Sequence, residues 1–447
     1  MRQRLLKDGS KRLEYEIREI VKKANKLRAI GKNIYWENIG DPIKKNASMP
    51  AWIKSVVKEL VEDDASYAYC PSKGEYETRR FLAEKNNQLS KVQITEEDIL
   101  FFNGLGDAIS KVYQYLHKGS RVIGPSPAYS THSSGEAAHA GKEPLVYELD
   151  PQNNWYPDVD ELYNKVKYNP AIVGILIINP DNPTGMVYPL ETLQKIVEIA
   201  KEFDLFIISD EIYHNITYNG ARAYTLAEVI EDVPGIAMKG ISKEFPWPGS
   251  RCGWMEFYNR KVDAEFDQLC AVLEDAKMIE VCSTTLPQKA IPIVMSDKRY
   301  LPYLEEKNQQ IGERSKIIAS ILQDIPYITF NETFGAFYNT IVFKEGALKE
   351  HQYLQIENPK EKELIESWLT DDIAFDKRFV YYLLAAKGVC VVPLSSFHSE
   401  LKGFRVTLLE EDEDLLKETF EKIREAVMEY CTSEIEHLAV NHETASN

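Results

Sequence analysis

The chain has 447 residues, of which 44% are hydrophobic and 28% charged, with 53 Lys and Arg residues against 70 Asp and Glu residues. These proportions are typical of a globular protein with a large core and exclude a wholly disordered chain. The net charge of −17 argues against nucleic acid or an anionic membrane as the main partner, because both bind basic surfaces.

The cysteines, histidines and apolar runs lack the spacing of metal or membrane sites. The six cysteines include no C-x-x-C pair, and the eight histidines show neither H-x-x-x-H nor H-E-x-x-H. We therefore expect reduced thiols and no metal centre. The first residues are too charged for a signal peptide, and the longest apolar run, Ala171–Ile178, is too short to span a bilayer. The sequence thus predicts a cytoplasmic protein with no membrane partner.

Apolar periodicity divides the chain into three regions. Helical spacing predicts an amphipathic helix over Arg12–Ala29. From about Ala51 to Val294, short apolar runs alternate with helical stretches, which predicts βαβ units and a parallel sheet. A long charged helix, four strand-like segments and a closing helix follow. These are predicted at Leu301–Ile321, Tyr327–Phe330, Phe337–Phe343, Val389–Val392, Gly403–Leu408 and Glu413–Tyr430.

This order of elements predicts an α/β fold with two domains. Residues 51–305 would form a large domain around a mostly parallel sheet, and residues 1–50 and 306–431 a smaller α+β domain. Residues 432–447 are expected to form a flexible tail. The charged segment Glu345–Phe375 is interpreted as either a surface insertion or a solvated helix.

Polar segments follow several buried strands at the point where each strand ends. They begin at Asn103, Pro125, Asn179, Asp210 and Gly240. Because ligands bind beyond the carboxyl ends of strands in open α/β sheets, we expect these segments to converge on one crevice. That crevice would hold a glycine turn, an aromatic ring, an amide, a carboxylate, a phenol and a lysine.

Each of these residues also has a purely structural interpretation. Asp210 can cap the next helix, and Lys243 can be a solvated surface lysine. The turn Gly104–Gly106 can bind a phosphate, but it lacks the Lys-Ser/Thr of a P-loop and the third glycine of a dinucleotide fingerprint. Structural roles are equally open for Tyr129, Asn182, Tyr213, Arg251 and Arg405.

Together, these residue types suit the chemistry of an aldehyde cofactor. A lysine amine can hold an aldehyde as a Schiff base, and a carboxylate beside a pyridine nitrogen keeps that nitrogen protonated. A phenol and an amide can hydrogen-bond a ring hydroxyl, and an aromatic side chain can stack on the ring. The glycine turn and one arginine suit a phosphate, while a second arginine can bind a carboxylate through two hydrogen bonds.

In motif order, nearly the whole chain resembles the class I/II aminotransferases that depend on pyridoxal 5'-phosphate (PLP), which are members of fold type I in the aspartate aminotransferase superfamily. The most specific motifs are N-P-x-N-P-T-G at Asn179–Gly185, D-E-x-Y at Asp210–Tyr213 and S-K-x(4)-P-G-x-R-x-G at Ser242–Gly253. The other matching segments are Ile39–Pro42, Tyr67–Arg79, Gly335–Tyr338 and Phe404–Arg405. The resemblance implies seven strands in the large sheet.

The resemblance also implies a role for each residue of the crevice. Lys243 would form the Schiff base with PLP and move a proton between the substrate Cα and the cofactor. Asp210 would pair with the ring nitrogen, and Tyr129 would stack on the ring. The remaining implied roles are binding of the ring oxygen by Asn182 and Tyr213, binding of the phosphate by Gly104, Leu105 and Arg251, a further cofactor contact by Ser242, and binding of the substrate by Gly40, Asn182 and Arg405.

Family members place their sites at a dimer interface, so the resemblance implies a homodimer in which Tyr69 reaches the neighbouring subunit's site. It also implies cis peptide bonds at Ser126–Pro127 and Asn182–Pro183. The sequence departs from the usual family pattern at Gly240, where a hydroxyl residue is common, at Leu105 in the phosphate loop and at Leu394, where many members have glycine.

The implied activity is transfer of an amino group between an L-amino acid and a 2-oxo acid. The alternative is a C–S β-lyase or an enzyme of the aminocyclopropane-carboxylate-synthase type, because the fate of the carbanion depends on substrate orientation. A binding or regulatory protein is a further alternative, against which the presence of both Lys243 and Asp210 argues. The sequence does not identify the amino donor, and no second arginine for a dicarboxylate side chain is evident.

Overall fold

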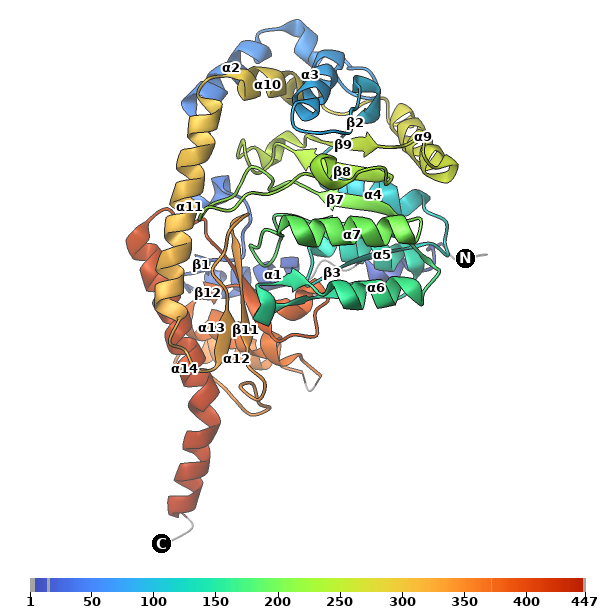
Figure 1. The fold of residues 1–447 in the computed structure, drawn as a ribbon. Helices are drawn as coiled ribbons and strands as arrows, with labels where there is room; N and C mark the ends of the chain where they lie inside the picture. The colour runs from blue at the N-terminus through green and yellow to red at the C-terminus, as the bar shows by residue number, and fades with distance from the viewer. Residues whose placement is uncertain (1–4, 14–16, 371, 445–447) are drawn as a thin grey trace.

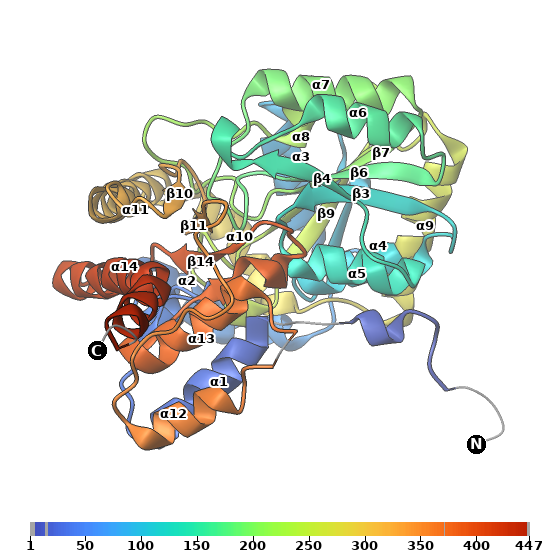
Figure 2. The same ribbon diagram turned by 90° about the horizontal axis from the view of Figure 1, so that it is seen from below.

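The computed structural model describes residues 5–13, 17–370 and 372–444. Figure 1 shows the course of the chain, and Figure 2 shows a large sheet between two layers of helices. A smaller antiparallel sheet and the long helices α11 (Tyr300–Leu322) and α14 (Glu413–Thr444) lie beside this layered part. The molecule therefore has the α/β fold predicted from the sequence.

The large sheet has the strand order β2-β9-β8-β7-β6-β3-β4-β5. Among the described residues, β9 and β5 run antiparallel to their neighbours, and the other strands of the sheet share one direction. The strands are β2 (Ile99–Phe102), β3 (Arg121–Ser126), β4 (Val146–Asp150), β5 (Tyr156–Pro157), β6 (Ile172–Ile178), β7 (Phe206–Asp210), β8 (Gly235–Gly240) and β9 (Gly253–Tyr258).

The central strands are apolar along their whole length because both faces of the sheet are covered. Along β6, Ile175 and Ile177 pack in one hydrophobic cluster, whereas Leu176 and Ile178 pack in another. Figure 2 shows α6 and α7 on one face of the sheet and α4 and α5 on the other. A parallel sheet buried in this way reads as continuous apolar runs, so its polar residues are confined to the strand ends.

Helices surround this sheet and connect its strands. They are α2 (Ala51–Val61), α3 (Tyr76–Asn87), α4 (Leu105–Tyr115), α5 (Ser130–Ala140), α6 (Val159–Lys167), α7 (Leu190–Glu202), α8 (Leu226–Val229), α9 (Ala264–Ile279) and α10 (Thr285–Ser296). In Figure 1, α2, α3 and α10 lie together at the top of the molecule.

The smaller sheet has the order β10-β11-β14-β13, and β1 pairs separately with β12. Its strands share a third core with α1, α11, α13 and α14, in which Phe379, Phe404 and Phe420 are fully buried. The elements of this part are α1 (Ile17–Ala29), β1 (Tyr35–Trp36), β10 (Ile328–Phe330), β11 (Tyr338–Phe343), α12 (Pro359–Glu366), α13 (Phe375–Lys387), β12 (Val389–Cys390), β13 (Val392–Pro393) and β14 (Gly403–Thr407).

The structure corrects several details of the predicted elements. The large sheet has eight strands rather than seven, because the two-residue β5 adds to the β4 edge. The described part of the first helix begins at Ile17 rather than Arg12, and residues 14–16 lie outside the described residues. Helix α14 continues to Thr444 instead of ending at Tyr430, since no glycine or proline interrupts that stretch. The predicted flexible tail is thus helical over 432–444, and 445–447 lie outside the described residues.

The second predicted cis bond is also corrected. The bond Ser126–Pro127 is cis as predicted, but the other cis bond is Asn179–Pro180 and not Asn182–Pro183. The two Asn-Pro bonds, at 179–180 and 182–183, belong to the same motif N-P-x-N-P, and the local sequence does not show which of them is cis. The predicted domain boundary at residue 305 falls inside the continuous helix α11, and the division into two domains stays a prediction.

The charged segment Glu345–Phe375 is neither a detached insertion nor a fully solvated helix. It contains α12, whose Ile365 is buried. The carboxylate of Glu361 on the same helix accepts a hydrogen bond from Lys32 Nζ at 2.9 Å. The segment therefore packs on the smaller sheet's side of the molecule.

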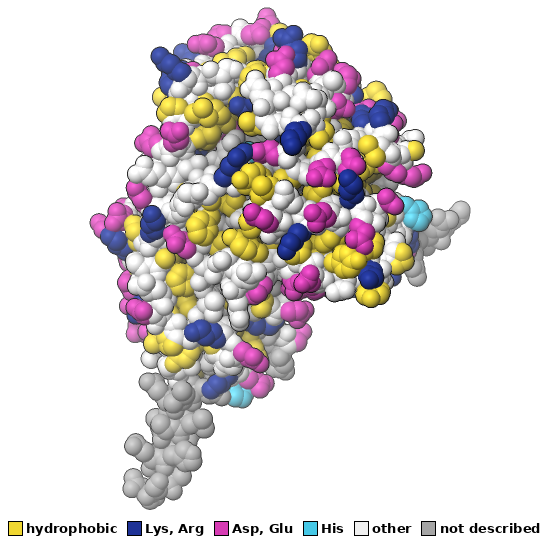
Figure 3. Space-filling view, in the orientation of Figure 1, with side chains coloured by type: hydrophobic (Ala, Val, Ile, Leu, Met, Phe, Trp, Pro, Cys, Tyr) yellow, Lys and Arg dark blue, Asp and Glu magenta, His cyan; other side chains and the backbone are white. Residues whose placement is uncertain are grey.

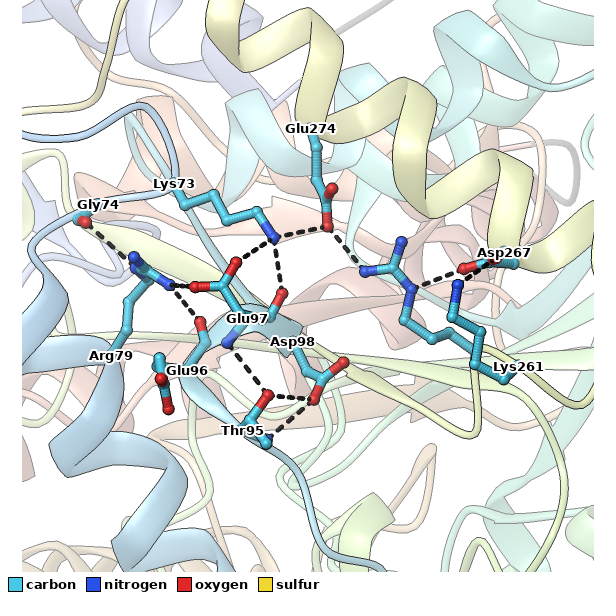
Figure 4. Close-up of polar contacts among 11 residues, drawn as sticks. Lys73, Gly74, Arg79, Thr95, Glu96, Glu97, Asp98, Lys261, Asp267 and Glu274 are labelled. Carbon is cyan, nitrogen blue, oxygen red and sulfur yellow. Dashed lines mark hydrogen bonds and ion pairs between the residues drawn. The ribbon is translucent and has the colours of Figure 1, made fainter.

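Ion pairs join α9 to the loop that precedes α3 (Figure 4). Lys73 Nζ lies 3.1 Å from Glu274 of α9 and 3.1 Å from Glu97. Glu97 also pairs with Arg79 at 3.3 Å, and Arg79 Nε donates to the Gly74 carbonyl at 3.1 Å. Because three of these residues belong to the segment directly after Tyr69, this network fixes the backbone that follows that exposed tyrosine.

The network makes part of the stability dependent on pH. Hydrogen bonds and charge from Lys73, and then from Arg79, hold the pKa of Glu97 below its ordinary value of 4.5. A carboxyl with a lower pKa in the folded protein stabilises it above the unfolded pKa, and this contribution is lost as pH falls through the folded pKa. We expect Glu97→Gln to lower the free energy of unfolding by less than about 1 kcal/mol at pH 7, because Glu97 is 62% exposed.

Urea unfolding at pH 7 and at about pH 4 measures this effect, and the difference between Glu97→Gln and wild type should shrink at the lower pH. Glu305→Gln, an exposed position on α11, is the matched control and should behave as wild type at both values. A stability difference that does not change with pH would contradict the assignment.

Candidate active site

A cavity of about 270 Å³ lies beyond the carboxyl ends of β3, β6, β7 and β8, and residues of β11 and β14 also line it. The structure brings most of the predicted site residues together there. Those lining the cavity are Gly40, Leu105, Tyr129, Asn182, Asp210, Tyr213, Ser242, Lys243, Arg251 and Arg405. A larger cavity of about 630 Å³ lies at the opposite, amino ends of β6 and β7, and none of the predicted residues lines it.

Lys243 stands in the turn that follows β8. Its Nζ donates a hydrogen bond to the Gly40 carbonyl at 2.7 Å. It also lies 5.8 Å from the ring centroid of Tyr213 and 5.6 Å from that of Phe337. The amine is thus held by a carbonyl and two aromatic rings, a setting in which it can exchange its hydrogen bond for a ligand.

Asp210 is the last residue of β7 and is buried. The β6–β7 register places it opposite Ile178, at the end of the sheet that faces the cavity. Its Oδ2 lies 3.0 Å from Nε2 of His132 on α5, and its Oδ1 accepts from the Ile212 amide at 3.2 Å. The carboxylate is therefore fixed in direction by both oxygens while it lines the cavity.

Arg405 on β14 reaches the same cavity from the smaller sheet. Its Nη1 donates to Asn182 Oδ1 at 3.1 Å and its Nη2 to the Asn38 carbonyl at 2.8 Å. Its buried Nε has no hydrogen-bond partner among the described residues. The guanidinium lies 4.4 Å from the ring centroid of Tyr338. A buried guanidinium with spare donors suits a carboxylate ligand.

Tyr213 lines the same cavity and bonds to Tyr338, the tyrosine whose ring lies against this arginine. Its hydroxyl is 3.0 Å from the Tyr338 hydroxyl, and either oxygen can be the donor. Burial raises the pKa of Tyr213 well above its ordinary value of 10.0, with the neighbouring Tyr338 as a further cause. The phenol therefore keeps its proton and can donate a hydrogen bond into the cavity.

The first turn of α4 and Arg251 form an anion cradle at another side of the cavity. Gly104 caps the helix with a positive φ of 84°, and a Cβ there would collide with the Arg251 guanidinium. Gly106 has open space where a Cβ would lie, so a ligand can approach the backbone closely. The unpaired N–H groups of a helix start, beside a guanidinium, suit a phosphate.

The remaining predicted positions differ in how they meet the cavity. A Cβ at Gly40 would collide with the Tyr338 hydroxyl, which explains the glycine. A Cβ at Gly240 would lie 3.0 Å from the Cys252 carbonyl oxygen, so β8 has little room there for the hydroxyl residue common in the family. Leu394 is buried in the core and does not line the cavity. Tyr69 is 83% exposed and lies outside the cavity of its own chain.

Several residues of the site were not singled out from the sequence. His132 stands three positions after Tyr129 on α5, a spacing that places the two on one side of the helix start. Tyr338 was recognised only as part of a motif. Lys307 of α11 donates to the Lys243 carbonyl at 2.8 Å, and burial lowers its pKa to about 8. From the sequence, Gly106 was named only as part of the turn Gly104–Gly106, and no role was given to the other cavity residues Asn38, Ile178, Ile212 and Pro248.

Features of other kinds of site are not found in the described parts of the chain. No helix there combines the length and apolarity needed to cross a membrane. Over the same residues, no group of three or more His, Cys, Asp or Glu side chains is placed to hold a metal ion. On the described part of the face in Figure 3, Lys and Arg side chains are interspersed with Asp and Glu and form no basic patch.

Comparisons with known proteins place the chain among aminotransferases. The family described as aminotransferase class I and II matches residues 38–423. An uncharacterized aminotransferase of Methanocaldococcus jannaschii is 54% identical over 96% of this chain and 99% of its own length. The glutamate-pyruvate aminotransferase AlaA of Escherichia coli is 30% identical over 72% of this chain and 79% of its own. The structure of an alanine aminotransferase from Pyrococcus furiosus matches with a TM-score of 0.82 at 26% identity, covering 95% of this chain and all (100%) of its own.

Proposed function

The chain belongs to the class I and II aminotransferases, and we propose that its substrate pairs are glutamate with 2-oxoglutarate and alanine with pyruvate. It is a PLP-dependent enzyme of fold type I that moves an amino group between an amino acid and a 2-oxo acid. The relatives named for alanine or for glutamate and pyruvate support the proposed substrates. Elimination is not favoured, because the relatives are named aminotransferases.

The donors around the cavity fit PLP. An anion cradle at Gly104 and Arg251 matches the phosphate, and the carboxylate of Asp210 matches a basic ring nitrogen. Lys243 offers an amine that donates its hydrogen bond to the Gly40 carbonyl and not to a carboxylate. When bound, PLP supplies an aldehyde that condenses with amines and a ring that withdraws electrons from the substrate Cα. The observation that carries the proposal is that Lys243, Asp210 and Arg405 line one cavity.

We assign each residue a task that its position allows. Lys243 Nζ, once it has released the Gly40 carbonyl, would take the proton of the substrate Cα and deliver it to the cofactor. Asp210, oriented by His132, holds a proton on the ring nitrogen through its charge. Arg405 binds the substrate α-carboxylate through two nitrogens, with Gly40 beside it. The other proposed contacts are ring-oxygen binding by Asn182 and Tyr213, ring stacking by Tyr129 and phosphate binding by Leu105, Ser242 and Arg251, all of which line the cavity. Gly104 does not line the cavity itself but lies against the Arg251 guanidinium, and we propose that it contributes to the phosphate site.

A screen of amino donors tests the proposed reaction. The PLP-loaded enzyme is mixed with pyruvate and each amino acid in turn, and alanine is quantified. We expect glutamate to give the highest rate, and 2-oxoglutarate to appear in equal amount. Release of ammonia and pyruvate from an amino acid without a 2-oxo acid would indicate elimination and contradict the proposal. A different preferred donor would overturn the substrate assignment while leaving amino transfer intact.

Arg405→Lys is expected to raise KM for the amino acid by about 10- to 100-fold, with a smaller change in kcat. Lysine keeps the charge but cannot form two parallel hydrogen bonds, and a bond between charged groups contributes about 1.5–3 kcal/mol. Initial rates over a range of alanine and glutamate concentrations measure the change. Arg424→Lys on α14, whose guanidinium donates to the Ile321 carbonyl, is the control. An unchanged KM in Arg405→Lys would remove the carboxylate role from this residue.

We propose that the enzyme works as a homodimer with Tyr69 at the interface. Tyr67, Tyr69, Met278 and Ile279 are 70%, 83%, 57% and 84% exposed, and large exposed apolar side chains mark interaction surfaces where they gather. The turn that carries Tyr67 and Tyr69 is tied to α10 by Thr285 Oγ1, which donates to the Ala68 carbonyl at 2.7 Å. A second copy of the chain would cover this surface.

Sedimentation of wild type and Ile279→Glu tests the dimer. We expect wild type to sediment as a dimer and Ile279→Glu to shift toward the monomer with loss of activity. Tyr168→Glu, at an equally exposed aromatic residue (76%) after α6, should remain dimeric. A monomeric, active wild-type enzyme would refute the proposal.

We further propose a cytoplasmic location, which the six free cysteines support and cell fractionation would test.

A further inference from the structure

Tyr338, the first residue of β11, lies between three of the proposed active-site residues. Its hydroxyl is 3.0 Å from the Tyr213 hydroxyl, and the face of its ring lies 4.4 Å from the Arg405 guanidinium. Gly40 packs so closely on the Tyr338 hydroxyl that no Cβ fits between them. Tyr338 is 2% exposed and lines the cavity, yet none of the tasks proposed above uses it.

The hydroxyl of Tyr338 extends a chain of hydrogen bonds. Tyr213 and Tyr338 are both buried, and their rings meet edge to face at 85° with centroids 5.7 Å apart. Each hydroxyl has one donor proton, so a Tyr213 that donates to a ligand oxygen must accept from Tyr338. A hydroxyl that accepts a hydrogen bond becomes a better donor, because the two bonds polarise each other.

The ring of Tyr338 has a different contact. The guanidinium of Arg405 contacts two aromatic rings, at 4.4 Å from the centroid of Tyr338 and 5.2 Å from that of Phe397. Such contacts contribute about 0.5–2 kcal/mol and favour a guanidinium plane that faces the rings. The bonds to Asn182 and to the Asn38 carbonyl then fix the direction in which the remaining N–H groups point.

We propose that Tyr338 is a positioning residue with two separable tasks. Its hydroxyl donates to Tyr213 and strengthens the bond from Tyr213 to the ring oxygen of PLP. Its ring holds the Arg405 guanidinium in the plane that binds the substrate carboxylate. The inference rests on the proposed roles of Tyr213 and Arg405, and it adds a residue that touches both of them.

The two tasks predict different effects for two variants of the PLP-loaded enzyme. Tyr338→Phe removes the hydroxyl and keeps the ring. The visible absorbance of bound PLP changes with pH as the nitrogen of its link to Lys243 loses a proton, and the midpoint of this change should rise by about 0.5–1 pH unit. A weaker donor at Tyr213 leaves more negative charge on the ring oxygen, so this proton is held more tightly. Tyr338→Met keeps most of the volume but removes the ring. Because it lacks the hydroxyl too, it should shift the pH midpoint as Tyr338→Phe does. In addition, it should raise the inhibition constant of propanoate, an unreactive carboxylate, about 3- to 30-fold, whereas Tyr338→Phe should leave that constant within about twofold.

The pH midpoint must be read against the charged and titratable groups that face the tyrosine pair. Among the described residues these are Asp210 at the end of β7, Tyr129 before α5, Lys243 after β8 and Arg405 on β14. Tyr338→Phe changes none of them. Tyr258→Phe is the matched control, because it removes another buried hydroxyl, bonded to Glu256 and Asn86 and outside the cavity.

The midpoint and the inhibition constant are measured for wild type, the two variants and the control. The inference is overturned if Tyr338→Phe shifts the midpoint no more than Tyr258→Phe, or if Tyr338→Met binds propanoate as wild type does. Tyr338→Leu replaces the methionine variant if that protein does not fold. Tyr213→Phe and Arg405→Lys identify the source of a failure. If Tyr213→Phe leaves the pH midpoint unchanged and Arg405→Lys leaves the inhibition constant unchanged, the proposed roles of Tyr213 and Arg405 fail. If these two variants change the two quantities, only the role of Tyr338 fails.

Discussion

Lys243→Ala is expected to lower kcat by at least about 10⁴-fold and to remove the covalent link between the protein and its cofactor. The amine of Lys243 is proposed both to bind the cofactor aldehyde and to move the substrate Cα proton, and proton transfer by a positioned group alone contributes about 10²–10⁴-fold. No other lysine lines the described cavity, so no neighbouring amine can replace it. Lys307, which bonds the Lys243 carbonyl, reaches the backbone of this residue and not the cavity.

Reductive trapping measures the loss of the covalent link separately from the loss of turnover. Wild-type enzyme treated with borohydride and digested should yield one peptide that carries the cofactor mass on Lys243, and the alanine variant should yield none. Lys261→Ala, at a 78% exposed lysine, is the control and should keep both the labelled peptide and full turnover. A labelled peptide from Lys243→Ala, or a labelled wild-type peptide that lacks residue 243, would place the reactive amine elsewhere.

The sequence predicts much of this arrangement because its signals are local. Continuous apolar runs identify β6 and β7, and the polar segments that follow them lie at one edge of the sheet, since parallel strands end at the same side. Asn182, Asp210 and Lys243 could therefore be expected to lie near each other before any coordinates were known. The seven strands implied by the resemblance were wrong by one, and the sequence could not correct this number because the two-residue β5 has no periodicity to detect.

The residues that the sequence did not reveal act through contacts between distant parts of the chain. His132 meets Asp210 across 78 positions, and Tyr338 meets Tyr213 across 125. A histidine on a helix or a tyrosine at the start of a strand carries no local sign of such a partner. The same holds for Gly240, whose lack of a side chain follows from the close approach of the Cys252 carbonyl in the neighbouring chain segment. Packing decides these positions.

Asp210→Asn is expected to lower kcat by about 10²–10³-fold while PLP stays bound and KM for the amino acid changes little. The substitution keeps the size of the side chain but removes the charge that is proposed to hold a proton on the ring nitrogen. Loss of one electrostatic contact to a developing charge has an effect of this order. The cofactor should remain, because its phosphate and aldehyde are proposed to contact Arg251, α4 and Lys243 instead.

The rate at which the Cα proton of alanine exchanges with deuterium measures the step concerned, and it should fall by the same factor as kcat. Asp210→Glu keeps the charge but displaces it from His132, so it should fall between wild type and the asparagine variant. Asp267→Asn, which removes a partly exposed carboxylate of α9 that pairs with Arg260 and Lys261, should exchange at the wild-type rate. Exchange in Asp210→Asn at the wild-type rate would show that the charge of Asp210 is not needed. Loss of PLP with no change in the rate per bound cofactor would instead make Asp210 a residue that only holds the cofactor. The proposed role requires the opposite result, because an acid paired with the ring nitrogen acts on the substrate Cα through the ring and not through affinity.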